Sequence, residues 1–492
     1  MHALTISFLV VSIILLIFFV IISFTFVGLF LSELGLWFSW IPLSFLIASI
    51  PFLILYSAEL HPRLDFFFLI VSSLFNLISY FRLMAPFYRV NITNRRLRKV
   101  MKRSLGEDYL IYIDPALKSN IIKKVRFRLS HYFSGINYKR IEEQVTTIDN
   151  VIYKEVDKES LALNVYSPKK EGKYPIIIYI HGGGWMRGSK DRFLELRILK
   201  RLACMGFVVF NIDYRLAPLP NLQTFREIPH DNPTIREMVS DVRASILFVT
   251  KNASKYNGDP KSLFLFGRSA GAHLALLTAF SCEEKFFDME GINCTIHDFD
   301  INGVIAFYPA TDLVELDKFY GEGAGIIFKQ SLYRSTGTKL EGAKSLYEIF
   351  SPISYVNEKN LERIPPVFLA AGSKDRIFDV YQSEELNEEL QNLGLTSVLL
   401  ELPWANHAFD AVINGPGGQL VFQYLSQFLV WAITRSRLKE IEEIVLKHGL
   451  EDILSIEKLS IIHALKQGKT EAEIANSFQK QKSEDNIQSK SK

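Results

Sequence analysis

The stretch Ser262-Leu-Phe-Leu-Phe-Gly-Arg-Ser-Ala-Gly-Ala-His273 places one serine between two glycines, after an apolar run and before a helix-forming one. This order predicts a sharp strand-to-helix turn that lifts Ser269 off the end of a strand. Such a turn strains the backbone, and Gly267 and Gly271 leave room for the chain to pass close to itself. A serine that only caps the following helix fits the same pattern. The motif alone leaves both interpretations open.

Short apolar runs separated by helix-length segments surround this turn in the chain. They cover residues 176–180, 207–212, 263–266, 304–307, 367–371 and 398–402. Strands that are apolar throughout and alternate with helices indicate a parallel sheet covered on both faces, so the predicted fold class is α/β. Two alternating runs, 151–156 and 161–166, bracket a charged turn and predict a hairpin at the edge of this sheet. Reactive groups are expected in the loops at the carboxyl ends of the parallel strands.

A base and an acid follow two of these predicted strands. A serine hydroxyl becomes a nucleophile only when a base takes its proton, and His407 lies just past the run 398–402. Asp375 lies just past the run 367–371, and the order serine, acid, histidine is one that catalytic triads use. Asp379 is a second candidate for the acid, but Asp375 is nearer the strand end. His273, on the helix after the serine, is expected to pack or to cap.

A glycine-rich loop follows the run 176–180. The sequence His181-Gly-Gly-Gly-Trp185 offers backbone N–H groups that can approach a substrate oxygen closely. We expect an oxyanion hole from the N–H groups of Gly182, Gly183 and Ala270. A phosphate-binding loop is excluded because the Gly-Lys-Ser/Thr ending is absent. The expected chemistry needs no cofactor and no metal.

Four motifs together resemble the hormone-sensitive-lipase-like branch of the α/β-hydrolases. They are His181-Gly-Gly-Gly-Trp185, Tyr214-Arg-Leu-Ala-Pro218, Gly267-Arg-Ser-Ala-Gly271 and Tyr308-Pro-Ala310. The resemblance covers residues 151–435 and implies a Ser269, His407 and Asp375 triad with an oxyanion hole at Gly182, Gly183 and Ala270. The segment from Thr234 to Asp241 and on through Gly267 to His273 is similar to membrane-anchored isoprenylcysteine methylesterases. Residues 219–233 depart from the lipase-like pattern and look like an insertion.

Two long uncharged runs lie at the N-terminus. Residues 1–32 and 34–58 contain no Asp, Glu, Lys or Arg, and each exceeds the roughly 20 residues that cross a bilayer as a helix. A third, shorter run at 66–81 either spans or lies at the interface. The first run lacks a basic n-region and a cleavage site, so we expect a retained helix and not a removed signal peptide.

Basic residues follow these runs and set the expected orientation. Eight of them, Arg82, Arg89, Arg95, Arg96, Arg98, Lys99, Lys102 and Arg103, come close together. Lys and Arg beside a span favour the cytoplasmic side, so we expect the large domain there, with the lipid bilayer as a partner. The net charge of the 492-residue chain is only +3, which gives no reason to expect nucleic acid. The three cysteines suit a reducing compartment and match no metal spacing.

The sequence thus predicts four parts. Residues 1–90 form a membrane anchor with two to three transmembrane helices, and 91–150 form a basic helical connector. Residues 151–435 form the α/β-hydrolase catalytic domain with cap insertions near 219–233 and 311–350. Residues 436–492 form a charged helical tail whose end is expected to be disordered.

The predicted function is a membrane-anchored serine esterase or lipase that hydrolyses carboxylic esters through an acyl-enzyme intermediate. Phe225, Phe319, Tyr320, Phe328 and Tyr333 in the expected caps offer apolar surface for a hydrophobic ester, or belong to ordinary core. An isoprenylcysteine methylesterase-like enzyme, an acyltransferase and an inactive hydrolase-fold binding module remain alternatives. The sequence names neither the ester nor the oligomeric state.

Overall fold

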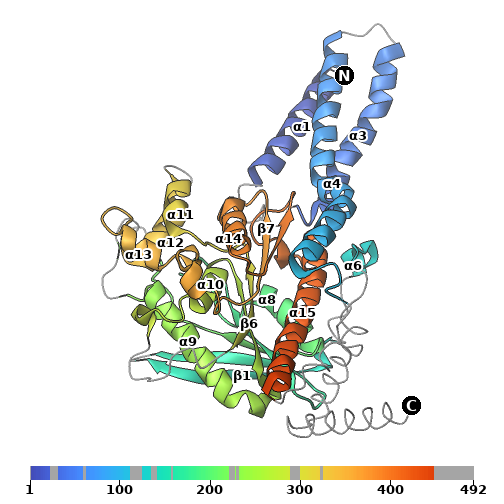
Figure 1. The fold of residues 1–492 in the computed structure, drawn as a ribbon. Helices are drawn as coiled ribbons and strands as arrows, with labels where there is room; N and C mark the ends of the chain where they lie inside the picture. The colour runs from blue at the N-terminus through green and yellow to red at the C-terminus, as the bar shows by residue number, and fades with distance from the viewer. Residues whose placement is uncertain are drawn as a thin grey trace, which may run out of the picture.

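The structure is a computed structural model that places an α/β domain beside a group of long N-terminal helices (Figure 1). It describes residues 2–22, 32–58, 63–110, 125–134, 141–156, 159–220, 228, 232–288, 300–321 and 325–447. Phe225, most of the predicted insertion at 219–233, and residues 448–492 of the predicted tail lie outside the described residues.

An eight-stranded sheet forms the centre of the domain, with strand order β1-β2-β4-β3-β5-β6-β7-β8. The strands are β1 (Val145–Val156), β2 (Glu159–Pro168), β3 (Tyr174–Ile180), β4 (Val208–Ile212), β5 (Gly258–Arg268), β6 (Ile301–Phe307), β7 (Val367–Gly372) and β8 (Ser397–Leu402). The first two form an antiparallel hairpin at one edge, and β2 pairs antiparallel with β4. From β4 to β8 all neighbouring strands are parallel. The predicted α/β class and edge hairpin agree with this sheet.

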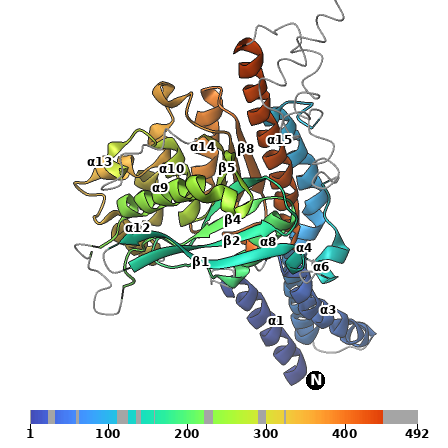
Figure 2. The same ribbon diagram turned by 90° about the horizontal axis from the view of Figure 1, so that it is seen from below.

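Helices cover both faces of the sheet (Figure 2). The described helices after α4 are α6 (Leu129–Ser134), α8 (Phe193–Cys204), α9 (Ile235–Asn252), α10 (Ala270–Phe280), α11 (Leu313–Tyr320), α12 (Ile326–Thr336), α13 (Lys344–Ile349), α14 (Val380–Asn392) and α15 (Pro416–Lys447), of which α8 and α15 lie against one face and α9 and α10 against the other. Short 3-10 helices lie at Ala253–Tyr256, Lys285–Phe287, Pro352–Tyr355, Glu358–Asn360 and Phe409–Ala411.

Two hydrophobic cores follow from the alternation of side chains along each strand. In β3, Ile176, Ile178 and Ile180 face the core beneath α9 and α10, whereas Ile177 and Tyr179 face the core beneath α8 and α15. Successive side chains of a strand point to opposite faces, so a strand buried on both faces is apolar at every position. This is why the sequence shows continuous apolar runs and no alternation in the parallel strands.

Three long helices precede the sheet: α1 (His2–Ile22), α3 (Gly35–Ala58) and α4 (Arg63–Leu105). The helices α1 and α3 and the first half of α4 extend away from the α/β domain, whereas the second half of α4 packs beside α15, and its Val90, Leu97 and Met101 belong to the domain core (Figure 1). Two helical stretches, Gly35–Leu55 and Leu64–Leu105, are long and apolar enough to cross a membrane by length and composition. The apolar stretch of α1, Ala3–Phe18, is shorter than that criterion requires.

Two helices run through boundaries that the sequence predicts. The helix α4 continues past residue 90 without a break and ends at Leu105, where Gly106 has a φ of 97°. A glycine with positive φ is a common way to end a helix, and no such residue occurs near position 90. The helix α15 likewise continues through residue 435. Both helices therefore join predicted parts that the sequence treats as separate.

Candidate active site

The turn after β5 holds Ser269 in a strained conformation. Its φ and ψ are 54° and −124°, a region that side-chain-bearing residues rarely occupy. A Cβ on Gly267 would lie 2.1 Å from the carbonyl oxygen of Gly271. A Cβ on Gly271 would lie 2.1 Å from the carbonyl oxygen of Ile180 at the end of β3. Only glycine fits at either position, because the turn packs its own backbone against itself and against the neighbouring strand.

Ser269, His407 and Asp375 lie within hydrogen-bonding distance of one another. The Oγ of Ser269 is 2.8 Å from Nε2 of His407, and Nδ1 of His407 is 2.7 Å from Oδ2 of Asp375. The other carboxylate oxygen of Asp375 accepts the backbone N–H groups of Ile377 and Phe378 at 2.8 and 3.0 Å. These bonds fix the carboxylate, which in turn orients the imidazole toward the serine.

The second candidate for the acid, Asp379, has a different position. Its carboxylate accepts the backbone N–H of Tyr381 and caps the N-terminus of α14. The side chain of His273 likewise lies within the core and has other partners. Its Nδ1 accepts the indole N–H of Trp185 at 3.1 Å, and its Nε2 donates to the carbonyl oxygen of Phe350 at 2.8 Å. Burial lowers the pKa of His273 to about 4, so its ring is neutral.

The glycine-rich loop after β3 lies beside the serine. A Cβ on Gly182 would lie 3.3 Å from the Cβ of Ser269, which shows how closely the two backbones approach. Gly183 has a φ of 140°, and a side chain there would collide with the carbonyl oxygen of Arg187. Ala270 is the first residue of α10, so its N–H is one of those that a helix leaves without an internal partner. Of the three predicted oxyanion donors, Gly182 and Ala270 thus lie on backbone next to Ser269, and Gly183 follows Gly182 in the same loop.

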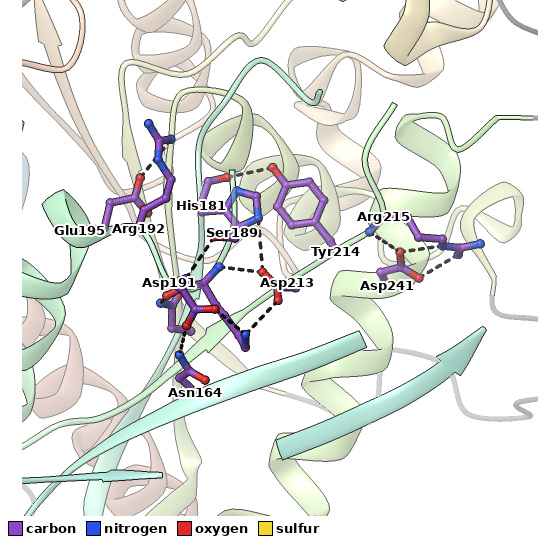
Figure 3. Close-up of polar contacts among 12 residues, drawn as sticks. Asn164, His181, Ser189, Asp191, Arg192, Glu195, Asp213, Tyr214, Arg215 and Asp241 are labelled. Atoms are coloured by element: carbon purple, nitrogen blue, oxygen red, sulfur yellow. Dashed lines mark hydrogen bonds and ion pairs between the residues drawn. The ribbon is translucent and has the colours of Figure 1, made fainter. Parts of the chain in front are cut away.

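A polar cluster behind this loop holds it in place (Figure 3). The Tyr214 hydroxyl donates to the carbonyl oxygen of His181 at 2.9 Å, and the two rings stack with centroids 4.4 Å apart. The Arg192 guanidinium donates to the carbonyl oxygen of Gly182 at 3.2 Å. Burial lowers the pKa of His181, which keeps this ring neutral beneath the loop.

The Tyr214-Arg-Leu-Ala-Pro218 motif also fixes the helix α9. The Arg215 side chain donates twice to the Asp241 carboxylate, at 2.8 Å each, and the Arg215 backbone N–H donates to it at 3.0 Å (Figure 3). Lys154 pairs with the same carboxylate at 2.6 Å. Asp241 is fully buried, so these charges stabilise a carboxylate that burial alone would disfavour.

A buried network that the sequence analysis missed links the serine turn to the histidine loop. Arg268, directly before Ser269, pairs through Nη2 with Oδ1 of Asp410 at 2.6 Å. The Tyr308 hydroxyl accepts from Nε of Arg268 at 2.9 Å and donates to Asp410 at 2.5 Å. The ring of Tyr308 also lies against His407, with centroids 4.4 Å apart. Arg268 and Tyr308 are inside quoted motifs, but no local signal points to Asp410 as their partner.

The predicted cap stretch 311–350 contains α11, α12 and α13, and α12 contacts the glycine-rich loop. The Ser331 hydroxyl donates to the carbonyl oxygen of Gly184 at 2.5 Å. Tyr320 is buried and stacks on Phe328, with centroids 5.9 Å apart, whereas Phe319 is 44% exposed. Tyr333 is half-buried. The aromatic side chains named in the sequence therefore divide between core and surface.

Comparisons with known proteins match this same part of the chain. A family model described as BD-FAE matches residues 163–390. The isoprenylcysteine alpha-carbonyl methylesterase ICME of Arabidopsis thaliana is 27% identical over 271 residues, which are 53% of this chain and 56% of that protein. The esterase LipC of Mycobacterium tuberculosis is 27% identical over 277 residues, which are 55% of this chain and 61% of that protein. The chain thus spans 56% and 61% of the lengths of these two relatives.

Among solved structures, esterase B from Lactobacillus rhamnosis is 21% identical. The match covers 62% of this chain and 94% of the esterase B chain, with a TM-score of 0.47. Residues 163–390, which match the family model, contain strands β3 to β7 and the serine turn after β5, and the similarity to esterases supports the esterase branch of the α/β-hydrolases.

Proposed function

We propose that this protein is a membrane-anchored serine esterase that hydrolyses carboxylic esters. The observation that carries the proposal is the hydrogen-bonded chain from Ser269 Oγ through His407 to Asp375, with distances of 2.8 and 2.7 Å. The esterases among the relatives support the reaction class.

In the proposed mechanism, His407 Nε2 takes the proton of Ser269 as Oγ attacks the ester carbonyl carbon. The carboxylate of Asp375 stabilises the resulting imidazolium and holds its tautomer. The imidazolium then protonates the leaving alkoxide, which leaves an acyl-enzyme. Water attacks this intermediate with His407 as base, and the acid and free serine are released. His407 thus moves one proton in each half of the reaction.

The negative charge that forms on the carbonyl oxygen in each step is assigned to three backbone N–H groups. Those of Gly182, Gly183 and Ala270 are fixed before the reaction by the loop and by the helix start. Fixed donors need no reorganisation during the reaction, and loss of one typically raises the barrier by about 3 kcal/mol. No substitution removes one of these backbone N–H groups without also moving the loop. The assignment of the oxyanion donors is therefore tested by changing the geometry of the turn that holds Ser269.

Membrane anchoring is supported by the distribution of side chains over α1, α3 and α4. Large apolar side chains point outward: Ile14, Trp40 and Phe67 are 57%, 62% and 57% exposed. Polar side chains instead meet between the helices. The Ser12 and Ser72 hydroxyls are 2.6 Å apart, Asn76 donates to Ser12 at 2.8 Å, and Thr5 donates to Asp65 at 2.7 Å. Apolar surface outside and hydrogen bonds inside suit a helix bundle in lipid.

The basic residues of α4 support a cytoplasmic position of the esterase domain. They begin at Arg82 and continue to Arg103, in the part of the helix that follows the uncharged run 66–81. A reporter fused after Lys492 tests this in sealed vesicles: protease added on the cytosolic side should digest it. Resistance to that protease would place the domain on the other side.

Extraction with alkaline carbonate tests anchoring itself. It should leave the protein in the pellet, and release into the supernatant would contradict anchoring.

The substrate is proposed to be a hydrophobic ester, because anchoring brings the site close to lipid-dissolved molecules. A second candidate, the methyl ester of an isoprenylated cysteine, is supported by the relatives ICME and ICMEL1 of Arabidopsis thaliana. Purified full-length protein should hydrolyse p-nitrophenyl esters, with rates measured over graded chain lengths and compared with farnesylcysteine methyl ester. The Ser269→Ala variant should be inactive on all of them. Equal activity of this variant would refute the proposal.

A further inference from the structure

One carboxylate from the N-terminal helices lies inside the esterase domain. Glu33 is in the turn directly before α3, and its side chain is fully buried. A buried carboxylate is strongly disfavoured unless hydrogen bonds replace its water. Burial raises the pKa of Glu33 to about 7, and the nearby Asp410 carboxylate acts in the same direction. The contacts of the Glu33 carboxylate must therefore offset the cost of its burial.

Two N–H groups of the esterase domain donate to Glu33. The indole Nε1 of Trp404 donates to Oε1 at 2.9 Å, and the backbone N–H of Gly417 donates to Oε2 at 2.7 Å. Trp404 lies in the loop between β8 and His407. Gly417 is the second residue of α15. One carboxylate thus joins the histidine loop to the start of the last helix.

The start of α15 is shaped to receive this carboxylate. The carbonyl oxygen of Gly415 accepts the N–H of Gln419 at 2.9 Å, so Gly415 is the N-cap residue and has no side chain with which to cap. A Cβ on Gly415 would lie 2.3 Å from Oε2 of Glu33, and one on Gly417 would lie 2.8 Å from Oε1. Glu33 occupies the space of the missing side chain and supplies the negative charge that a helix N-terminus favours.

The loop that Trp404 belongs to carries His407 and contacts the loop that carries Asp375. Its Ala405 carbonyl oxygen accepts the N–H of Lys374, next to Asp375, at 3.0 Å. His407 follows two residues later. A shift of the Trp404 indole would therefore move the imidazole and the acid loop together, and small misplacements of reacting groups lower rates by large factors.

We propose that Glu33 is a positioning residue that holds the His407 loop through Trp404, so that the N-terminal helices form part of the scaffold of the active site. This inference rests on the proposed esterase function. It assigns to the anchor a role in the rate of the reaction in addition to its role in location.

The experiment uses the full-length protein in detergent at pH 8.5, above the pKa of about 7 to which burial raises Glu33. Glu33→Gln keeps the size of the side chain but turns an amide N–H toward one of the two donors. Trp404→Phe removes the indole N–H and keeps an aromatic ring. The control is Tyr424→Phe, which removes another buried contact between the N-terminal helices and α15, the 2.7 Å hydrogen bond to Asn94. The double variant Glu33→Gln/Trp404→Phe tests whether the two residues act together.

Four quantities are measured for each variant: the concentration of active sites, kcat, KM and the unfolding temperature. Titration with a fluorophosphonate counts active sites, and kcat per titrated site and KM are measured with p-nitrophenyl butyrate. We expect Glu33→Gln and Trp404→Phe each to lower kcat about tenfold with KM changed less than twofold. The double variant should be no more than about twofold slower than the slower single variant, because both substitutions remove the same contact between Glu33 and Trp404. Tyr424→Phe should lower the unfolding temperature while its kcat per site stays within twofold of wild type.

Each other outcome has a definite meaning. Unchanged kcat per site in Glu33→Gln overturns the inference, as does an equal loss in Tyr424→Phe, which would make the effect one of general stability. A fold loss of kcat in the double variant that equals the product of the two single losses would show that Glu33 does not act through Trp404, and would also overturn the inference. A wild-type protein that the fluorophosphonate does not label overturns the proposed function itself, and the inference with it.

Discussion

Removal of the Arg268 charge is predicted to destabilise the protein strongly, and a second substitution is predicted to restore part of the loss. Arg268 is 5% exposed, and Nη2 lies 2.6 Å from Oδ1 of Asp410. Arg268→Met leaves the Asp410 carboxylate buried with the Tyr308 hydroxyl as its remaining close donor. Loss of one partner of a buried ion pair typically costs about 3–5 kcal/mol, because the other charge stays uncompensated.

The double variant Arg268→Met/Asp410→Asn neutralises that orphaned charge and keeps an acceptor for Tyr308. We expect it to be more stable than Arg268→Met by about 1 kcal/mol or more. Urea unfolding followed by tryptophan fluorescence, in one detergent and at one pH, measures both differences. A loss of less than about 1 kcal/mol in Arg268→Met, or a further loss of stability when Asp410→Asn is added, would show that the Arg268–Asp410 pair does not stabilise the fold in this way.

Three further predictions concern single residues. His273→Gln should reduce the loss of stability in acid. Burial lowers the pKa of His273 from 6.5 to about 4, so the unfolded state is protonated first and the folded state loses up to about 3 kcal/mol as pH falls from 6.5 to 4, whereas Gln does not titrate. Unfolding midpoints at pH 7.5 and 4.5 test this, and an equal difference between them in the variant and the wild type would contradict it. Asp375→Asn should lower kcat about ten-thousandfold, the scale known for this change in a serine protease, whereas Asp379→Ala should cost about 1 kcal/mol of stability with kcat unchanged; the reverse pattern would make Asp379 the acid. Gly271→Ala should abolish ester hydrolysis, because its Cβ would lie 2.1 Å from a β3 carbonyl oxygen; retained hydrolysis would show that the turn can relax.

The sheet could be predicted because each parallel strand is buried on both faces and is therefore apolar in the sequence. The ends of the strands are harder to predict from the sequence than their existence. The strand β5 begins at Gly258, five residues before the apolar run, because Gly258 and Asp259 pair with β3 ahead of a register shift and carry no apolar signal. The helices α4 and α15 pass the predicted boundaries because composition changes along them while the backbone has no reason to stop.

The site residues could be named from the sequence because each follows an apolar run, and parallel strands bring their carboxyl ends to one edge. The contacts between distant segments could not. Asp410 meets Arg268, and Glu33 meets Trp404, through packing that has no local pattern. Glu33 did leave one sign: it is the single charged residue between the two uncharged N-terminal runs. A lone carboxylate in such surroundings predicts a buried partner.

We propose that Ser269 is a nucleophile activated by His407. Fluorophosphonate labelling of the full-length protein tests this, with the modified peptide identified by mass spectrometry. We expect one adduct, on Ser269, and labelling that falls at least a thousandfold in rate in His407→Ala. An adduct on another residue, or labelling of His407→Ala at the wild-type rate, would contradict it.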